Sequence, residues 1–586
     1  MTRTNDAAAQ MLEEFAELLA LSGGEPFKVR AYERAARAVE GWATDVSEMD
    51  EHDLDAIPGV GTHLAAKIVE FVRTGSVEEL DELRAVIPAG LRDLLDVPGL
   101  GPQRARQVYE ELGVTSRADL LDALHHHRLR ELPGWGAKSE ENLARSVEEA
   151  HRNGERIRLD VALSLADELL TGLRAEPAVE RCEYAGSLRR MAPTVGDVDL
   201  LAASGDPDAV MAAFVALPGV GRVLVRGGTK TSVVTTRGIQ VDLRVVDPSV
   251  YGAALVYFTG SRAHNIHLRE IAVREGRSLS EYGLVEVATG RVVAARTEDD
   301  VYAAFGLPWI PPTLREDLGE IEAGLAGTLP RVLRATDLRG DLHVHTTLSD
   351  GVSSLEEMVA AARTLGYRYL AVTDHGPRLF PGVTLERVLD QRERLRRLAC
   401  QGSMTLLHGT EVDVAPDGSL DWPDEVLAGF DVVVAGVHTA LRQSREAMTA
   451  RIVRALEHPA VRVLAHPTAR ALGRRGPVDA DWDEVLRVAA RTGTALEVNA
   501  APDRLDLDGS LCRRAIEAGC RLAVSSDAHA ASQLERIRVG AATAQRGWAR
   551  RADVVTTWPV DRLRRFLARP RSGRVGDERG VVKVRR

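Results

Sequence analysis

The sequence predicts a protein of several domains, with a helical N-terminal region, a central α+β region and a C-terminal α/β region. Three observations lead to this fold class. The chain has 586 residues, whereas a single hydrophobic core stops growing at roughly 250–300 residues. Amphipathic helical patterns fill residues 1 to about 150, and short apolar runs of strand character follow between about 160 and 245. From 339 to about 570, apolar runs such as YRYLAVTDH and FDVVVAGVH alternate with helical stretches, which is typical of a parallel sheet.

The composition is that of a globular protein, with 45% hydrophobic residues. Its four cysteines form no CxxC pair, which indicates a reduced, cytoplasmic environment. The first twenty residues carry acids where a signal peptide needs basic residues, and no apolar run approaches the roughly 18 residues that span a membrane. The formal net charge of −11 argues only weakly against a nucleic-acid partner, because a whole-chain sum hides local basic patches.

A Pro-Gly-x-Gly loop occurs three times in the helical region, as IPGVGTHLAAKI, VPGLGPQRARQV and LPGWGAKSEENL. Glycine lets the backbone approach a ligand closely, and the helix that follows each loop offers free N–H groups to a phosphate. One copy is equally compatible with a plain helix–turn–helix connection, but three copies favour helix-hairpin-helix binding of DNA without base readout. The glycines concerned are Gly59, Gly61, Gly99, Gly101, Gly134 and Gly136.

The run YAGSLRRMAPTVGDVDLLAA carries two acids of a candidate active site. Asp197 and Asp199 lie two apart on a predicted strand, so their side chains leave the same face. Asp242 lies inside another apolar strand, QVDLRVV, where an unpaired charge would be costly. Three converging carboxylates can hold two Mg²⁺ or Mn²⁺ ions for nucleotidyl transfer. Three nearby residues are candidates for binding phosphate oxygens: Gly186, Ser187 and Arg190.

Histidines and acids end the predicted strands of the C-terminal region, at the edge where α/β barrels build their sites. The stretch GDLHVHTTLSDG places its two histidines on one face of a strand. In all, nine residues are candidate metal ligands: His343, His345, Asp350, His375, Glu411, His438, His466, Asp527 and His529. Nine ligands indicate two or three ions, and the mixture of imidazole and carboxylate favours Zn²⁺, Mn²⁺ or Fe over Mg²⁺. Such a cluster suits hydrolysis of a phosphate ester.

A basic loop follows the predicted strand that ends at His466. Its arginines could engage a phosphate, although basic loops are usually just solvated. They are Arg470, Arg474 and Arg475.

Several of these motifs resemble known families. Gly-Ser ten residues before Gly-Asp-x-Asp, with a later acid on a strand, is similar to the nucleotidyltransferase superfamily, and YFTGSRAHNIHLR resembles the nucleotide-selecting segment of family X DNA polymerases. By that resemblance six residues would contact the incoming nucleotide or the nascent base pair: Tyr257, Phe258, Gly260, Ser261, Asn265 and Arg269. Met191 and Gln240 depart from the family pattern but leave the three acids intact.

The first Pro-Gly-x-Gly copy, AIPGVGTHLAAKIVEFVRTG, resembles the lyase helix of DNA polymerase beta and its relatives. The resemblance puts Lys67 at the position of the Schiff-base lysine and Lys28 near a 5′-phosphate contact. A lysine amine can attack an abasic-site aldehyde if its pKa is lowered. A lysine that only pairs with phosphate is at least as good an interpretation, so lyase activity is a hypothesis.

The order HxH…D…H…E…H…H…DxH resembles the PHP (polymerase and histidinol phosphatase) family, which folds as a distorted (β/α)7 barrel. Residues 5–570 as a whole resemble bacterial family X DNA polymerases that carry a C-terminal PHP domain. The resemblance implies the following segments: a lyase-like helical domain (1–85), a fingers-like helix-hairpin-helix region (86–155), an α+β nucleotidyltransferase palm (156–248), a thumb-like nucleotide-selecting subdomain (249–325), a linker (326–338), the PHP barrel (339–570) and a tail (571–586).

The resemblance also implies a function. It is gap-filling DNA synthesis in repair, base-excision repair included, with a PHP-domain 3′→5′ exonuclease that processes DNA ends. Mg²⁺ or Mn²⁺ would serve the polymerase site, and two or three Mn²⁺ or Zn²⁺ ions the PHP site. The expected partners are gapped or nicked DNA, primer 3′ ends and dNTPs, and the expected protein is a monomer at the nucleoid. The main alternative is a DNA end-processing nuclease or phosphatase, such as an abasic-site endonuclease or a 3′-phosphatase, with a weak or vestigial polymerase half.

Overall fold

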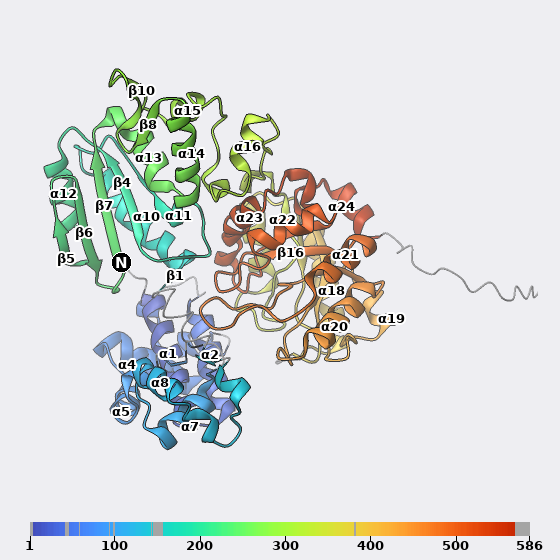
Figure 1. Ribbon diagram of the computed structural model, residues 1–586. Coiled ribbons are helices and arrows are strands. Elements are labelled where there is room, and N and C mark those ends of the chain that lie inside the picture. The colour runs from blue at the N-terminus through green and yellow to red at the C-terminus, as the bar shows by residue number, and fades with distance from the viewer. Residues whose placement is uncertain are drawn as a thin grey trace, which may run out of the picture.

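The structure is a computed structural model that describes residues 4–40, 46–57, 59–92, 94–95, 97, 100–141, 143–144, 156–379 and 382–568. The expected tail, 571–586, lies outside the described residues. A helical N-terminal region, a central region of two α+β units and a C-terminal α/β barrel follow one another along the chain (Figure 1). The predicted fold class is confirmed. None of the helices among the described residues is long and apolar enough to cross a membrane.

The N-terminal region is helical, and one apolar core unites its helices. Leu12 and Phe15 of the first helix, Val39 of the second and Ile68 of the fourth are all buried in that core. This matches the amphipathic patterns of the sequence, because each helix buries its apolar stripe against the others. The helices are α1 (Thr4–Leu21), α2 (Pro26–Glu40), α3 (Glu51–Asp55), α4 (Thr62–Thr74), α5 (Glu78–Val86), α6 (Ala89–Arg92), α7 (Pro102–Leu112) and α8 (Arg117–His125).

The first central unit is built on a five-stranded sheet with strand order β2-β4-β7-β6-β5. Strand β4 is parallel to β7, and the remaining neighbours are antiparallel. Helices α10 and α12 pack their apolar residues against this sheet. The elements are β1 (Ile157–Arg158), α10 (Leu159–Arg174), β2 (Arg181–Tyr184), α11 (Gly186–Arg189), β3 (Thr194–Val195), β4 (Val198–Ala203), α12 (Pro207–Val215), β5 (Val220–Arg226), β6 (Lys230–Thr235) and β7 (Gln240–Val246).

The second central unit combines helices with a three-stranded antiparallel sheet around a separate apolar core. Its elements are α13 (Tyr251–Thr259), α14 (Arg262–Arg274), β8 (Arg277–Ser280), β9 (Gly283–Glu286), β10 (Val292–Ala294), α15 (Glu298–Ala303) and α16 (Glu320–Leu325).

The C-terminal region is a barrel-like sheet of seven parallel strands in sequence order, β11 to β17. The segments that follow the first and last strands also meet, since Asp527 N donates to His343 O at 3.0 Å and His345 N donates to Ala528 O at 2.8 Å. The strands are β11 (Gly340–Asp341), β12 (Tyr369–Val372), β13 (Thr405–Asp413), β14 (Val432–Gly436), β15 (Val461–Leu464), β16 (Ala495–Asn499) and β17 (Arg521–Ser525). The helices are α17 (Leu355–Thr364), α18 (Leu385–Ala399), α19 (Asp424–Leu427), α20 (Arg445–Glu457), α21 (Trp482–Thr492), α22 (Gly509–Glu517), α23 (Ile537–Arg546) and α24 (Val560–Leu567).

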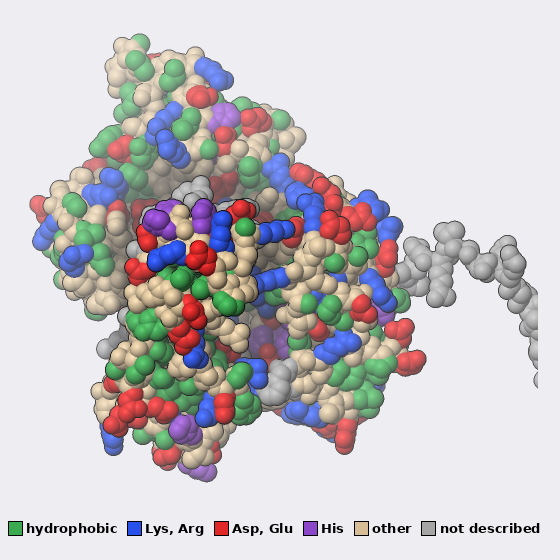
Figure 2. Space-filling view, turned by 60° about the horizontal axis from the view of Figure 1, so that its bottom comes forward, with side chains coloured by type: hydrophobic (Ala, Val, Ile, Leu, Met, Phe, Trp, Pro, Cys, Tyr) green, Lys and Arg blue, Asp and Glu red, His purple; other side chains and the backbone are tan. Residues whose placement is uncertain are grey.

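Loops at the carboxyl ends of the barrel strands pack against the rest of the chain. Val352 and Ala530 are buried with the apolar core of the N-terminal helices, and Leu505 is buried with the core of the central five-stranded sheet. In Figure 2 a recess lies between the N-terminal and C-terminal lobes, with histidine and acidic side chains at its floor and Lys and Arg side chains along its rim. The barrel therefore turns its strand ends toward the other regions.

Candidate active sites

Three aspartates meet at the edge of the central sheet. Asp199 of β4 and Asp242 of β7 are paired in register across the two parallel strands. The sequence predicted Asp197 on this strand, but it lies one residue before β4 begins. Its carboxylate still reaches those of Asp199 and Asp242. One carboxylate oxygen of each acid lies within 4.8 Å of the others. We call these three residues the acid triad; its donor set of carboxylate oxygens suits Mg²⁺ or Mn²⁺.

Mutual repulsion and burial make one member of the triad hard to ionise. Burial first, and then the charges of Asp197 and Asp242, raise the pKa of Asp199 to about 7. Burial also acts to raise the pKa of Asp242, but hydrogen bonds from Lys230 and Gln240 outweigh it and lower that pKa. A divalent cation would relieve the same repulsion, so the triad fits a metal.

Lys230 is a residue of this site that the sequence reasoning missed. Its Nζ lies 2.6 Å from Asp242 Oδ2, while Gln240 Nε2 donates to Asp242 Oδ1 at 3.1 Å. The signal in the sequence was a lone lysine opening a strand that is otherwise apolar or hydroxylic, KTSVVT. The position of that strand beside β7 could not be known from the sequence.

The turn before β4 lies directly against the triad. Gly186 has φ 57°, and a Cβ at this position would overlap the Asp199 carboxylate, so only glycine fits here. Ser187 follows Gly186 in the short helix α11. The Arg190 guanidinium pairs with Glu316 Oε1 at 3.0 Å and donates to Thr259 O at 2.5 Å. Glu316 and the Arg190 carbonyl both accept from Arg546 of the barrel helix α23.

A buried ion network joins the two central units beside this turn. Glu298 accepts hydrogen bonds from Arg189 at 2.7 and 2.9 Å and from Arg315 at 2.7 Å. Burial opposes the charge of Glu298, but Arg315 and Arg189 lower its pKa to about 2. The network holds Arg189, and with it the Gly186–Arg190 turn, on the second unit.

The residues of the predicted nucleotide-selecting segment lie at the junction of α13 and α14. Asn265 Nδ2 donates to Tyr257 O at 2.7 Å, and the Arg269 guanidinium lies 5.0 Å from the Tyr257 ring centroid. The rings of Tyr257 and Phe258 are in edge contact. Between the helices come the remaining two residues of the prediction, Gly260 and Ser261, the second of which caps α14.

The glycine loops of the N-terminal region leave space for a ligand. Gly61 and Gly101 cap α4 and α7, and a Cβ at either residue would meet open space, as it would at Gly136. Gly59 and Gly134 have positive φ, at 88° and 80°. Gly99 lies outside the described residues.

Lys67 does not present a free amine. Its side chain is buried, forms an ion pair with Glu79, and its Nζ lies 4.8 Å from the centroid of the Phe15 ring. Lys28 of α2 is exposed. The amine of Lys67 is therefore occupied by Glu79 in this structure, and lyase activity stays a hypothesis.

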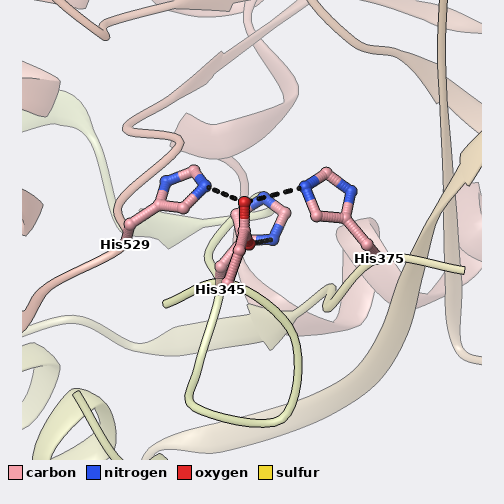
Figure 3. Close-up of side chains that lie close together, drawn as sticks. His345, His375 and His529 are labelled. Atoms are coloured by element: carbon pink, nitrogen blue, oxygen red, sulfur yellow. Dashed lines mark ion pairs between the residues drawn. The ribbon is translucent and has the colours of Figure 1, made fainter. Parts of the chain in front are cut away.

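The nine candidate ligands of the barrel meet at the carboxyl ends of its strands, and we call them the histidine cluster. Ligand atoms within 4.8 Å of one another form three overlapping groups: His345, Asp350, His375 and His529; His343, His345 and Asp527; His375, Glu411 and His438. Figure 3 shows the rings of His345, His375 and His529 converging, and the dashed lines from His375 and His529 reach a shared carboxylate oxygen, Asp350 Oδ2, at 3.3 and 3.2 Å.

Glu411 stands at the centre of the cluster. Its Oε2 lies 3.2 Å from His343 Nε2 and 3.0 Å from His375 Nδ1, and its Oε1 lies 3.0 Å from His438 Nε2 and 2.9 Å from His466 Nε2. His466 is thereby joined to the cluster although it belongs to none of the three groups. Three overlapping groups fit two or three ions, as the number of ligands predicts.

The ring nitrogens of the cluster are also in a state that suits metal binding. Within the described part of the chain, the buried Nδ1 atoms of His345 and His466 have no hydrogen-bond partner, and Nε2 of His343 and of His345 face one another at 3.1 Å. Burial and the nearby charge of Arg504 lower the pKa of His466 to about 3, so its lone pair is free. Burial, together with His529 and His375, lowers the pKa of His345 as well.

Glu497 supports the cluster and was missed from the sequence. Its Oε1 lies 2.8 Å from His343 Nδ1, and its Oε2 accepts from His466 N at 2.7 Å. It thereby fixes the ring orientation of one candidate ligand, as partners behind metal-binding histidines generally do. A charged residue inside the apolar run ALEVN was the available signal, the same one that identified Asp242.

Two of the three arginines that follow β15 serve the backbone rather than a ligand. Arg470 donates to the carbonyls of Arg504 and Leu505 and pairs with Asp508, and Arg475 donates to Ala469 O. Arg474 is exposed.

Comparison with known families assigns most of the chain. Residues 3–77 match the helix-hairpin-helix domain, residues 91–149 the SAM-like helix-hairpin-helix tandem, residues 254–316 the DNA polymerase beta thumb, and residues 341–501 the PHP domain.

Three relatives mark the extent of the similarity. DNA polymerase/3′-5′ exonuclease PolX of Bacillus subtilis (strain 168) is 36% identical over 96% of this chain and 98% of its own length. DNA polymerase lambda of Rattus norvegicus is 26% identical over 50% of this chain and 53% of its own. A probable phosphatase of Syntrophotalea carbinolica is 28% identical over 33% of this chain and 81% of its own. The chain belongs to the family X DNA polymerases that carry a C-terminal PHP domain.

Proposed function

We propose that this protein is a DNA repair polymerase that adds dNTPs to a primer 3′ end in short gaps and trims 3′ ends with a separate hydrolytic site. The observation that carries the proposal is that one chain holds both the acid triad and the histidine cluster, each with ligand atoms within 4.8 Å of one another. The name of the Bacillus subtilis relative, which covers nearly the whole chain, pairs the same two activities.

At the acid triad we propose that Asp197, Asp199 and Asp242 hold two Mg²⁺ or Mn²⁺ ions. Bound there, such ions supply Lewis-acid assistance to in-line transfer of a nucleotidyl group. The chain positions the reactants around them. The Gly186–Ser187 turn lies against Asp199 and would contact the triphosphate, and Arg190 would exchange Glu316 for a phosphate oxygen.

The second central unit would select the nucleotide. Tyr257 and Phe258 present their rings at the end of α13, and Asn265 and Arg269 are fixed against Tyr257. Gly260 and Ser261 set the turn between the helices. We propose that the rings lie along the incoming sugar and that the polar pair contacts the nascent base pair.

At the histidine cluster we propose two or three Mn²⁺ or Zn²⁺ ions that serve hydrolysis of a terminal phosphodiester. Bound there, such ions supply a nucleophile at neutral pH and neutralise phosphate charge. In the reaction the oxygen of water joins phosphorus, the bond from phosphorus to the 3′ oxygen breaks, and that oxygen takes a proton. The products are a nucleoside monophosphate and a strand shortened by one nucleotide with a 3′-hydroxyl.

DNA would be held by the helix-hairpin-helix loops through Gly59, Gly61, Gly101, Gly134 and Gly136, whose backbone can approach phosphates. Lys28 would add an exposed positive charge. We infer a monomer acting on nucleoid DNA in the cytoplasm, where gapped and nicked substrates arise.

One experiment tests both activities. A gapped duplex with a labelled primer is incubated with Mg²⁺ or Mn²⁺, with and without dNTPs, using wild type, Asp197→Ala and His343→Ala. We expect extension to be lost only in Asp197→Ala and degradation to be lost only in His343→Ala. Extension that survives Asp197→Ala, or degradation that survives His343→Ala, would refute the assignment of that site.

The similarity of the barrel to proteins named probable phosphatases favours a second candidate activity, removal of a 3′-phosphate from a primer end. The same cluster would serve, since the bond from phosphorus to the 3′ oxygen breaks in both reactions and only the group that stays on phosphorus differs. A primer that ends in a 3′-phosphate, followed for its conversion to an extendable 3′-hydroxyl, tests this, and conversion that is unchanged in His343→Ala would exclude it.

A further inference from the structure

Arg504 lies at the edge of the histidine cluster, in the loop after β16. Its Nε is 3.7 Å from Asp527 Oδ2, and its side chain is 24% exposed. The other oxygen of Asp527, Oδ1, lies 3.2 Å from His345 Nε2. The guanidinium therefore stands behind a candidate ligand, at the boundary between the buried cluster and solvent.

The loop that carries Arg504 is fixed on both sides. Arg470 donates to the Arg504 carbonyl at 2.8 Å and also to the carbonyl of Leu505. The Leu505 side chain is fully buried in the apolar core of the central sheet, so the polymerase half anchors this part of the barrel. A side chain on such a loop is held in place before a substrate arrives, which is what a precise contact requires.

The donors of the Arg504 guanidinium are available to a ligand. Among the residues that the structure describes, none accepts a hydrogen bond from it, and its ion pair with Asp527 is longer than a hydrogen bond. Arg470 and Arg475, by contrast, donate hydrogen bonds to backbone carbonyls. Arg504 thus combines a permanent charge, a forked set of donors and a place beside the cluster, which suits a phosphate better than a lone carboxylate.

We propose that Arg504 grips a non-bridging oxygen of the phosphate that the histidine cluster hydrolyses. The proposal rests on the proposed hydrolytic function and adds a substrate-contacting residue outside the nine ligands. The ligand class is a phosphate at a DNA 3′ end, either a terminal phosphodiester or a 3′-phosphomonoester. Negative charge accumulates on those oxygens as the new bond to phosphorus forms. A guanidinium already held in position therefore stabilises the transition state more than it stabilises the bound substrate.

A simpler role for Arg504 is to neutralise Asp527 and so keep that ligand in place. The two roles differ in what a substitution changes. Loss of a phosphate contact lowers turnover and weakens phosphate binding while the metal content stays the same. Loss of support for Asp527 lowers the metal content together with the activity.

The test uses the full chain loaded with Mn²⁺, as wild type, Arg504→Ala, Arg504→Lys and the control Arg397→Ala. Arg397 is an exposed arginine of α18 on the outside of the barrel. Three quantities are measured: release of the 3′-terminal nucleotide from a labelled strand, inhibition of that release by inorganic phosphate, and bound metal by elemental analysis. Extension of a gapped primer is followed in parallel.

We expect Arg504→Ala to lower kcat/KM for nucleotide release by about 10²-fold, mainly in kcat, with weaker inhibition by phosphate. Metal content, extension and the Arg397→Ala control should match wild type. Arg504→Lys should recover only part of the loss, because lysine keeps the charge but not the fork. Metal loss in Arg504→Ala, full activity of that variant, or full rescue by lysine would overturn the proposal. Absence of nucleotide release in wild type would instead contradict the proposed hydrolytic function.

Discussion

In the central sheet three carboxylates converge without a histidine, whereas in the barrel six imidazoles surround three carboxylates. The acid triad is therefore a concentration of negative charge that Lys230 relieves in part, and burial with like charges still raises the pKa of Asp199 to about 7. In the histidine cluster, positive and negative groups stabilise one another. Asp350 and Glu411 outweigh the effect of burial and raise the pKa of His375 well above its ordinary value. The histidines in turn hold the pKa of Glu411 well below the ordinary value of a glutamate.

The difference teaches how one chain can separate two metal-dependent reactions. A site of oxygen donors selects hard cations such as Mg²⁺, and a site of mixed nitrogen and oxygen donors selects Mn²⁺ or Zn²⁺. The supports differ as well. The triad depends on an ion network that joins two units of the chain, while the cluster depends on side chains of its own barrel, such as Glu497.

The largest effect is expected from Glu411→Gln, which tests whether the cluster acts as one unit. Its two oxygens contact four imidazoles, so an amide would lose several metal contacts at once. We expect hydrolysis of 3′ ends to fall by about 10³-fold, because each 1.4 kcal/mol of lost stabilisation costs about tenfold. Extension of a gapped primer should stay within about twofold of wild type.

Asp199→Asn is the matched control for Glu411→Gln, since it makes the same chemical change at the other site. It should abolish extension and leave hydrolysis intact. A common loss of both activities in either variant would mean that the two sites are not independent.

The sequence could predict residues whose pattern is local. Asp197 and Asp199 lie two residues apart at the start of β4, and the histidines of the barrel end apolar runs, so strand geometry was enough to expect each set to converge. Residues whose role depends on a neighbour distant in the sequence could not be found this way. Lys230 reaches Asp242 only because β6 lies beside β7, and Arg504 reaches Asp527 only because its loop folds back over the barrel.

The basic loop after β15 shows the reverse case, in which residues singled out from the sequence have other partners in the structure. Arginine beside a predicted phosphate site was a reasonable candidate for substrate contact, but Arg470 and Arg475 are occupied by backbone carbonyls. The sequence shows which side chains can donate hydrogen bonds, but it does not show which acceptors the folded chain places beside them. Buried carbonyls must be paired, and in a barrel loop an arginine fork can pair two at once.

Glu298→Gln tests the ion network that supports the triad but not the cluster. The amide keeps the shape of the side chain but leaves Arg315 buried without a counter-charge and Arg189 with only its 3.6 Å ion pair to Glu183. Breaking a buried pair in this way costs about 3–5 kcal/mol in other proteins. We expect primer extension to fall by about 10²-fold through displacement of the Gly186–Arg190 turn. Hydrolysis of 3′ ends by the same preparation should be unchanged, and an equal fall in both rates would contradict the comparison.

The two sites should also differ in their response to pH. Because the pKa of Asp199 is raised to about 7, this carboxyl holds a proton below that pH, and a cation must displace the proton in order to bind. The Mg²⁺ concentration that half-saturates extension should therefore rise about tenfold for each pH unit below about 7 and level off above it. Extension rates titrated with Mg²⁺ at pH 6, 7 and 8 measure this, and a half-saturating concentration independent of pH would show that Asp199 is ionised throughout.

The smallest effect is expected from Lys230→Met, which removes the ammonium that is ion-paired with Asp242 of the triad. Lys230 Nζ lies 2.6 Å from Asp242 Oδ2, where it competes with a divalent cation for the same oxygen, yet its side chain is 37% exposed and the ion pair is screened by water. Exposed pairs are worth about 0.2–1 kcal/mol, so the half-saturating Mg²⁺ concentration should fall by at most about fivefold. Lys230→Arg keeps the charge and should restore the wild-type value, while hydrolysis at the barrel is unaffected by either change. A higher Mg²⁺ requirement in Lys230→Met would reverse the sign and make Lys230 an aid to metal binding, through the lowered pKa of Asp242, rather than a competitor.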